Sequence, residues 1–222
     1  MGCGREAPLA KLLYSSKMAP AWYLGIDAGK IEPFNFGSKK DSFDLLPERD
    51  FPVWHMGTAP EALFTHIVCF EVLEHVEPER CIKILKGIYA RLAEGAMAYI
   101  STPCWNGSAA GNHVNEMRHD VMGALLERHG FFIRSVFGTF ASITDYVSSL
   151  TPGQREVFED LREYYDTNVL SCLLAPLHPR GSRNCLWVVS KRCPPDRPFR
   201  YPYLKTIDGQ WASSEQWKEL AE

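Results

Sequence analysis

The sequence has no CxxC pair, no long apolar run and no large excess of charge of either sign. Because its seven cysteines are scattered, neither a zinc knuckle nor a redox dithiol is predicted, and free thiols indicate a reducing, cytoplasmic location. No apolar stretch approaches the roughly 20 residues of a membrane-spanning helix, so no membrane partner is expected. The net charge of −3 provides no overall attraction to nucleic acid.

What the sequence does contain is an alternation of strand and helix patterns. Strands, indicated by β-branched and aromatic runs, are expected at residues 21–27, 52–57, 65–72, 96–102, 131–140 and 184–192. Helices, indicated by apolar positions three and four residues apart, are expected at residues 8–17, 78–93, 119–130 and 152–174. Gly95 is the expected C-cap of the second helix. This order predicts an α/β fold with a mostly parallel sheet and helices on both faces.

One domain is expected over residues 1–192, because that range holds all the predicted elements. It includes a helical insertion at about 141–183, in which Thr151 is the expected N-cap and Pro152 the first helical residue. This insertion is predicted to cover the substrate pocket. Residues 193–222 are rich in proline and are predicted to form a tail without a core. Basic residues towards the C-terminus are expected to form a solvated face: Arg180, Arg183, Lys191, Arg192, Arg197 and Arg200.

Glycines and acids stand where the parallel strands are expected to end, the edge at which α/β sheets bind ligands. Gly2-Cys3-Gly4 precedes the first helix and offers backbone N–H groups at close approach. Asp27 ends the next strand, 23 residues after Gly4, near the offset at which an acid binds ribose hydroxyls. Glu71 ends a strongly apolar strand. By themselves these residues are compatible with a nucleoside site or with ordinary turns.

A longer run, HIVCFEVLEHVEPERCIKILKGIYARLAEGAMAYISTP from His66, distinguishes the two interpretations. It has a strand ending in EVLEH, an amphipathic helix ending in L-x-x-G and a strand ending in STP. This pattern resembles the middle of the Rossmann-like S-adenosylmethionine (SAM)-dependent methyltransferases. The segment NHVNEMRHDVMGALLERHGF at 112–131 is similar to the H-x-x-E turn, helix and G-F step of that family. With GCG and GID the resemblance spans about residues 2–138, and it recurs in LWVVSKR.

The resemblance implies a mostly parallel, seven-stranded sheet whose last strand runs antiparallel. It also implies SAM as the cofactor. Gly2 and Gly4 would then lie against the methionine part of SAM, Asp27 would hold the ribose, and the backbone at Phe70 and Glu71 would border the sulfonium. The residues implied for cofactor binding are Gly2, Cys3, Gly4, Asp27, Ala28, Thr58, Phe70 and Glu71.

The sequence departs from the family pattern in two places. Many members bind the adenine with an acid after the third strand, where this chain has HMGTAPEA, so Thr58 or backbone groups are expected to serve. In the family a hydrophobic strand commonly precedes the glycine-rich turn, here Gly2-Cys3-Gly4 and called the glycine hook below. This sequence has only Met1 in the place of that strand. The first strand is therefore expected to be missing, and a chain extended by that strand is expected to be more stable and to bind SAM more tightly.

Methyl transfer is an in-line displacement, which needs alignment, exclusion of water and, for a weak nucleophile, a base. The sequence leaves the base undetermined, with His75, His113 and Glu116 as candidates. Glu74 and His75 are expected either to orient the turn after the strand or to bind a divalent metal, and a site without metal is the main prediction. The run E-x-x-E-H with a later His also resembles the small-RNA terminal 2′-O-methyltransferases. That resemblance implies Glu71, Glu74, His75 and His113 as metal ligands.

The acceptor is expected near the loop after the STP strand and the insertion, with Trp105, Asn106, His113 and Tyr146 as binding residues. The leading hypothesis is a SAM-dependent methyltransferase acting on a small molecule, a nucleotide or a nucleic acid. The alternatives are a metal-dependent RNA 2′-O-methyltransferase and a non-catalytic SAM-fold binding or partner protein. A dehydrogenase matches less well, because GCGREA lacks the third glycine of G-x-G-x-x-G. A homo-oligomer is allowed.

Overall fold

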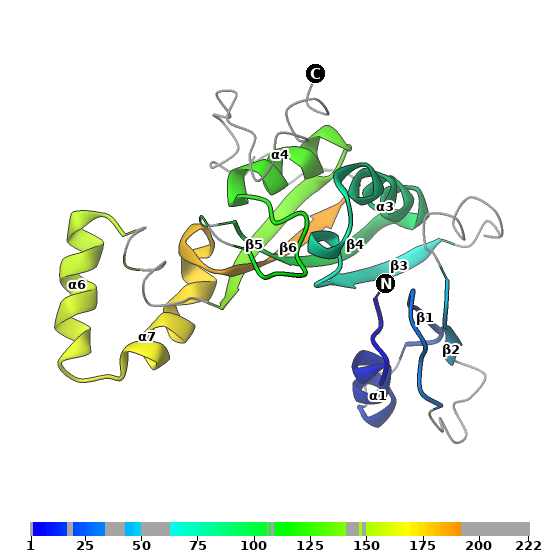
Figure 1. Ribbon diagram of the computed structural model, residues 1–222, viewed down its shortest axis with the longest axis horizontal. Helices are drawn as coiled ribbons and strands as arrows, with labels where there is room; N and C mark the ends of the chain where they lie inside the picture. Colours follow the sequence, from blue (N-terminus) through cyan, green and yellow to red (C-terminus); the bar gives the residue numbers. More distant parts are fainter. Residues whose placement is uncertain are drawn as a thin grey trace. The chain divides into compact units, whose positions relative to one another are not determined.

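The computed structural model describes residues 2–16, 20–33, 43–49, 63–105, 107, 109–140, 147 and 150–191. Helices and strands alternate along them, which confirms the predicted α/β class (Figure 1). The chain divides into an N-terminal unit, Met1–Ala62, and a C-terminal unit, Leu63–Glu222. The strand predicted at 52–57 and the tail predicted at 193–222 lie outside the described residues.

The N-terminal unit contains helix α1 (Pro8–Ser15) and two parallel strands, β1 (Tyr23–Ile26) and β2 (Phe43–Leu46). The helix and β1 lie where the sequence predicted them. Strand β2 was not predicted, because it is only four residues long, carries Asp44 and follows a polar stretch. A small apolar cluster joins these elements, made of Ala7, Ala10, Leu13, Tyr14, Tyr23, Ile31 and Leu45.

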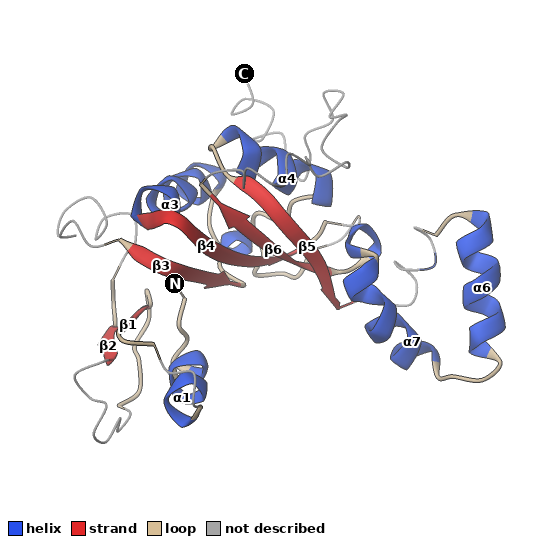
Figure 2. Cartoon of the chain, turned by 180° about the vertical axis from the view of Figure 1, so that it is seen from behind, coloured by secondary structure: helices blue, strands red, loops and turns tan. Residues whose placement is uncertain are grey.

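The sheet of the C-terminal unit has four strands in the order β3-β4-β6-β5 (Figure 2). Strands β3 and β4 are parallel, whereas β6 runs antiparallel to both of its neighbours, as the resemblance implied for the last strand. The described residues hold six strands in two sheets, where seven in one sheet were expected. The bounds are β3 Phe64–Phe70, β4 Leu92–Pro103, β5 Phe132–Phe140 and β6 Asn184–Ser190.

Helices α3 (Pro78–Arg91) and α4 (His119–Arg128) lie against this sheet (Figures 1 and 2). The buried positions of α3 recur at the predicted helical spacing: Cys81, Ile84, Leu85 and Ile88. The prediction that Gly95 caps this helix is wrong, because α3 ends at Arg91 and the chain enters β4 directly. Gly95 instead supplies a φ of 74° inside β4, where the register between β3 and β4 shifts. A short 3₁₀ turn, η2 (Leu73–His75), precedes α3.

The insertion before β6 forms two helices, α6 (Pro152–Arg162) and α7 (Thr167–Leu174). Thr151 is the predicted N-cap, and it forms a capping box with Gln154. The carboxylate of Asp166 starts α7 by accepting two backbone N–H bonds, so the one predicted helix is divided. The helices share a small core of their own: Leu150, Phe158, Leu170 and Ala175. The 3₁₀ turns η3 (Ala175–Leu177) and η4 (Pro179–Gly181) lead to β6.

All six cysteines among the described residues are free thiols. Within the described ranges, no helix combines the length and the apolarity that crossing a bilayer would require.

Gly138 allows β5 to pack closely against the end of the insertion. A Cβ atom added there would overlap the Ser182 side chain and the carbonyl oxygen of Ala175. Because that oxygen belongs to the backbone, η3 would have to move, and we expect Gly138→Ala to lower the free energy of unfolding by about 2 kcal/mol. Gly153→Ala is the control, since nothing lies within 4 Å of its added Cβ. Equal urea-unfolding midpoints for the two variants would contradict this prediction.

Candidate functional site

The glycine hook and the acid at the end of β1 lie together in the N-terminal unit. The N–H of Cys3 donates to the last carbonyl of β1 at 3.2 Å. The N–H of Gly4 donates to Asp27 Oδ2 at 2.8 Å, and the N–H of Gly29 donates to Asp27 Oδ1 at 2.8 Å. Gly2 and Gly4 have φ values of 58° and 76°, which favour glycine. The hook and the acid that the sequence analysis paired are therefore joined by a hydrogen bond.

Asp27 keeps capacity for a further ligand. An ionised carboxylate has about four acceptor positions, and the two backbone N–H groups use two of them. The side chain of Asp27 is half-buried, and Ala28 beside it is exposed. Burial, and secondly the charge of Asp27, raise the pKa of the Cys3 thiol, so Cys3 offers its backbone rather than a thiolate. Thr58, the predicted adenine contact, lies outside the described residues.

Glu71, at the end of β3, is held by two other strands of the C-terminal unit. Ser101 Oγ donates to its Oε1 and Asn184 Nδ2 donates to its Oε2, both at 2.7 Å. Its backbone has a φ of 52°, a conformation that costs on the order of 1 kcal/mol or more for a residue with a side chain. The carboxylate is thus engaged by β4 and β6 and is not in the group that Glu74 and His75 form. The four metal ligands implied by the resemblance to the small-RNA methyltransferases therefore do not form one group.

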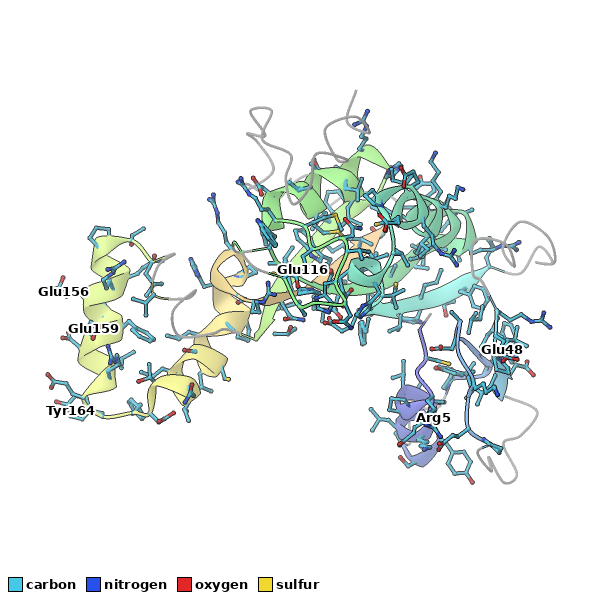
Figure 3. All side chains as sticks on the ribbon, viewed as in Figure 1. Arg5, Glu48, Glu116, Glu156, Glu159 and Tyr164 are labelled. Carbon is cyan, nitrogen blue, oxygen red and sulfur yellow. The ribbon has the colours of Figure 1, made fainter. Side chains whose placement is uncertain are left out.

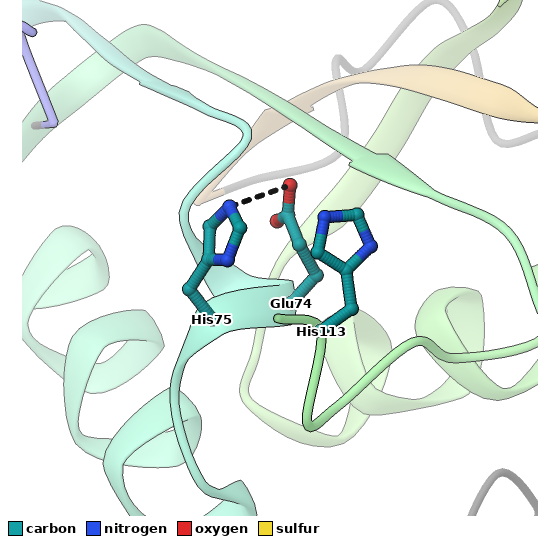
Figure 4. Close-up of side chains that lie close together, drawn as sticks. All are labelled: Glu74, His75 and His113. Atoms are coloured by element: carbon teal, nitrogen blue, oxygen red, sulfur yellow. Dashed lines mark ion pairs between the residues drawn. The ribbon is translucent and has the colours of Figure 1, made fainter. Parts of the chain in front are cut away.

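Glu74, His75 and His113 form a compact group, called here the Glu–His cluster. One ligand atom from each side chain lies within 4.8 Å of the other two (Figure 4). Glu74 and His75 belong to η2, and His113 lies on the loop between β4 and α4. The backbone fixes this approach, because the N–H groups of Val114 and Asn115 both donate to the Glu74 carbonyl, at 2.9 and 3.1 Å.

Each imidazole of the Glu–His cluster is oriented through its Nδ1 atom. His75 Nδ1 lies 3.1 Å from the carbonyl oxygen of Asn112, which only accepts, so this nitrogen carries the proton. His113 Nδ1 lies 2.5 Å from Glu116 Oε1 and donates to that carboxylate. In the neutral form of each ring the Nε2 atom then holds the lone pair, and Figure 4 shows both rings turned towards the carboxylate of Glu74.

Glu116 is buried and is held by Arg183 through two hydrogen bonds. Arg183 Nη1 donates to Glu116 Oε2 at 2.7 Å and Nη2 donates to Oε1 at 2.9 Å. The same guanidinium donates to the carbonyl of Cys104, which ties it to the end of β4. Figure 3 shows Glu116 among the central elements of its unit, whereas Tyr164 lies in the turn after helix α6. The solvated face predicted for Arg183 is wrong, because its side chain is only 18% exposed.

The carboxyl of Glu74 is almost completely buried, with 1% of the residue exposed. Among the described residues, none donates a hydrogen bond to either of its carboxylate oxygens. Burial raises the pKa of Glu74 to about 7, and the charge of Glu71 acts in the same direction. The backbone of Glu74 itself, together with His75 and His113, lowers this pKa and offsets part of the effect. Among the described residues, the basic atom in ion-pair range is His75 Nε2, which lies 3.8 Å from Oε1 and is therefore beyond hydrogen-bond distance.

The predicted acceptor residues are only partly described. Trp105 is half-buried, and its N–H donates to the carbonyl of Met117 at 2.9 Å. Phe70, predicted beside the sulfonium, has an exposed side chain. Asn106 and Tyr146 lie outside the described residues. The sequence analysis missed Ser101, Arg183 and Asn184, and no local pattern could have found them, since each acts across a long separation in the chain.

The comparisons with known proteins agree with the observed α/β fold. A family model described as a methyltransferase domain matches residues 1–137. Among curated proteins, none matches the sequence significantly. A SAM-dependent methyltransferase from Archaeoglobus fulgidus has a TM-score of 0.52 at 15% identity, with 86% of this chain and 83% of that chain covered.

Two further solved structures have the same fold. One is the 1,6-didemethyltoxoflavin-N1-methyltransferase of Burkholderia thailandensis, solved with bound 1,6-didemethyltoxoflavin and S-adenosylhomocysteine. It has a TM-score of 0.53 at 14% identity, with 86% of this chain and 69% of that chain covered. The [4+2]-cyclase SpnF has a TM-score of 0.54 at 11% identity, with 87% and 73% covered. At these identities the likeness shows the fold alone, and SpnF shows that this fold is also found in a protein named for a different reaction.

Proposed function

This chain belongs to the methyltransferase domain family of SAM-dependent enzymes, and we propose that it transfers the methyl group of SAM to a small-molecule acceptor. The observation that carries the proposal is the hydrogen bond between the glycine hook and Asp27. It fixes a carboxylate that still has unused acceptor positions. The backbone groups beside it are accessible because Gly2 and Gly4 have no side chains. Both features suit a ligand with ribose hydroxyls and an amino-acid group.

SAM supplies the activated methyl group, so the protein mainly has to bind, orient and exclude water. Of the three predicted catalytic residues, Glu116 fits a positioning role, because Arg183 and His113 occupy both of its oxygens. His75 and His113 remain candidates for acceptor chemistry, because their Nε2 atoms hold lone pairs when the rings are neutral. Phe70 and Glu71 stay predictions as neighbours of the sulfonium.

A small-molecule acceptor is favoured over a nucleic acid by two observations. The net charge is −3, so the chain as a whole does not attract polyanions. The Burkholderia thailandensis neighbour is named as an enzyme acting on 1,6-didemethyltoxoflavin, a small molecule. We therefore expect transfer of label from methyl-labelled SAM to members of a panel of small hydroxyl and amine compounds, and none to RNA oligonucleotides.

Asp27→Ala is expected to weaken binding of S-adenosylhomocysteine about ten- to a hundredfold, measured by isothermal titration calorimetry. The reason is the loss of an ionised acceptor for ribose hydroxyls, since a hydrogen bond to a charged group contributes about 1.5–3 kcal/mol. Asp44→Ala is the matched control, because this carboxylate lies in the same unit and accepts from Trp22 Nε1 at 2.6 Å.

Three outcomes of this titration are distinct. Loss of binding with Asp27→Ala alone supports the cofactor site. Equal affinities for both variants would overturn the role of Asp27. Tight binding by the natural chain without transfer to any compound of the panel would favour the non-catalytic alternative.

A further inference from the structure

Each residue of the Glu–His cluster turns one atom that could bind a metal towards the other two, and no hydrogen bond directly joins these three atoms. The only ion pair drawn within it, between His75 Nε2 and Glu74 Oε1, spans 3.8 Å (Figure 4). The rings of His75 and His113 meet edge to face with centroids 4.7 Å apart. Side chains that stabilised one another directly would be expected at closer polar contact, so the spacing leaves room for an atom between them.

The orientation of both rings is fixed from outside the cluster. His75 donates through Nδ1 to a backbone carbonyl, and His113 donates through Nδ1 to Glu116. Histidines that bind metals are commonly held in this way, with the second nitrogen donating to a carbonyl or carboxylate and the first nitrogen left as a ligand. Arg183 in turn fixes Glu116, so the imidazole of His113 has little freedom to turn away.

The buried carboxyl of Glu74 points to a bound cation independently of the orientation of the two rings. Its carboxyl is nearly inaccessible to solvent, and its two oxygens accept no hydrogen bond from any described residue. Burying such a group without a partner costs several kcal/mol if it is charged. A cation bound at Oε1 or Oε2 would compensate that cost, and no described side chain does so.

We propose that Glu74, His75 and His113 bind one divalent transition-metal ion. Two imidazoles and one carboxylate favour Mn²⁺, Fe²⁺, Co²⁺ or Zn²⁺ over Mg²⁺ and Ca²⁺, which prefer oxygen ligands. Atoms bound to one such ion at about 2.1 Å lie no more than about 4.2 Å apart, so the 4.8 Å spread needs only a small adjustment of side chains. The ligand set has three members instead of the four implied by the resemblance, because Ser101 and Asn184 engage Glu71.

Three protein ligands leave open positions on the ion, which is characteristic of catalytic rather than structural sites. The role of the ion rests on the proposed function, whereas its binding does not. An acceptor hydroxyl at an open position would lose its proton more readily. In the balanced reaction the O–H bond breaks and its proton leaves to solvent, the O–CH₃ bond forms, the C–S bond of SAM breaks, and the products are a methyl ether and S-adenosylhomocysteine. The acceptor class is therefore a small hydroxyl compound.

The test is a titration of the complete, EDTA-treated and dialysed chain with Mn²⁺ and with Zn²⁺, followed by calorimetry and, for Mn²⁺, by electron paramagnetic resonance. We expect one ion per chain, with affinity at least tenfold lower in His75→Ala and in His113→Ala. His66→Ala is the matched control, because His66 is an exposed histidine of β3 outside the cluster, and we expect it to leave the affinity unchanged. His113→Gln serves as a second variant if circular dichroism shows that the alanine variant is unfolded.

Two results would overturn the metal site: no stoichiometric binding by the natural chain, or equal affinities in the cluster variants and in His66→Ala. A parallel titration with S-adenosylhomocysteine separates this proposal from the proposed function. Metal binding without S-adenosylhomocysteine binding would retain the site and reject the function. The reverse result would retain the function and reject the site. Methyl transfer unchanged after EDTA treatment would reject the catalytic role of a bound ion.

Discussion

Replacement of Arg183 by methionine is expected to lower the free energy of unfolding by about 3 kcal/mol. The change removes both hydrogen bonds that the guanidinium makes to Glu116 and leaves that carboxylate buried without its counter-charge. Breaking a buried ion pair from one side costs about 3–5 kcal/mol, and we expect the lower end because His113 still donates to Glu116. Urea unfolding followed by circular dichroism measures the loss.

The ion pair of Arg162 and Glu159 is the matched control, because it has a similar length of 2.7 Å but both side chains are nearly half exposed. Arg162→Met is expected to cost less than about 1 kcal/mol. The double variant Glu116→Gln with Arg183→Met is expected to recover a large part of the loss, since no buried charge then remains. A loss in Arg183→Met no greater than that in Arg162→Met would show that the buried pair is not a major source of stability.

The local elements of this fold could be predicted because their signals lie within a few residues. The Thr151 cap, the apolar face of α3 and the presence of β3 follow from short patterns, and the structure confirms them, although β3 ends at Phe70, two residues before the predicted end. The two failures have different origins. Strand β2 is too short and too polar to be recognised, and Gly95 belongs to an irregularity in β4 that depends on pairing with β3.

The contacts of the site could not be predicted, because they join residues that only the tertiary fold brings together. Arg183 and Glu116 are 67 residues apart in sequence, and Asn184 and Glu71 are 113 apart. Spacing along the chain grouped Glu71 with Glu74, whereas the strand partners in the fold separate them. Sequence reasoning identified which residue types were available at the strand ends, and the packing of β6 against β4 decided which of them meet.

Arg183 and Asn184 also connect the insertion to the candidate site. These two consecutive residues end the insertion and begin β6, and they bind Glu116 and Glu71 respectively. A movement of the insertion that displaced this dipeptide would alter both carboxylates together. The link gives a physical route by which the predicted cover of the acceptor pocket and the chemistry of the site could influence each other.

A drop from pH 7 to pH 4 is expected to destabilise the protein through His119 by on the order of 3 kcal/mol. This side chain begins α4, is buried, and packs against Trp187 with ring centroids 4.8 Å apart. Burial, and secondly the charge of Arg180, lower the pKa of His119 to about 4, whereas Asp120 acts in the opposite direction. In the unfolded chain the same group has a pKa of about 6.5, so acid protonates the unfolded state first.

Because the unfolded chain takes up the proton first, the contribution of His119 to the free energy of unfolding is complete above about pH 6.5. It is lost as the pH falls towards about 4. Other groups also titrate. Burial lowers the pKa of His129 and of His178, so their contributions to stability also fall in acid, whereas burial raises the pKa of Glu74, whose contribution rises in acid. Comparison with His119→Gln cancels these contributions, because both proteins contain them. Urea unfolding of the two proteins between pH 7 and pH 4 should therefore show the steeper decline in the natural chain. Parallel curves would mean that His119 is protonated in the folded protein near its ordinary pKa, and that its packing against Trp187 does not exclude the charged form.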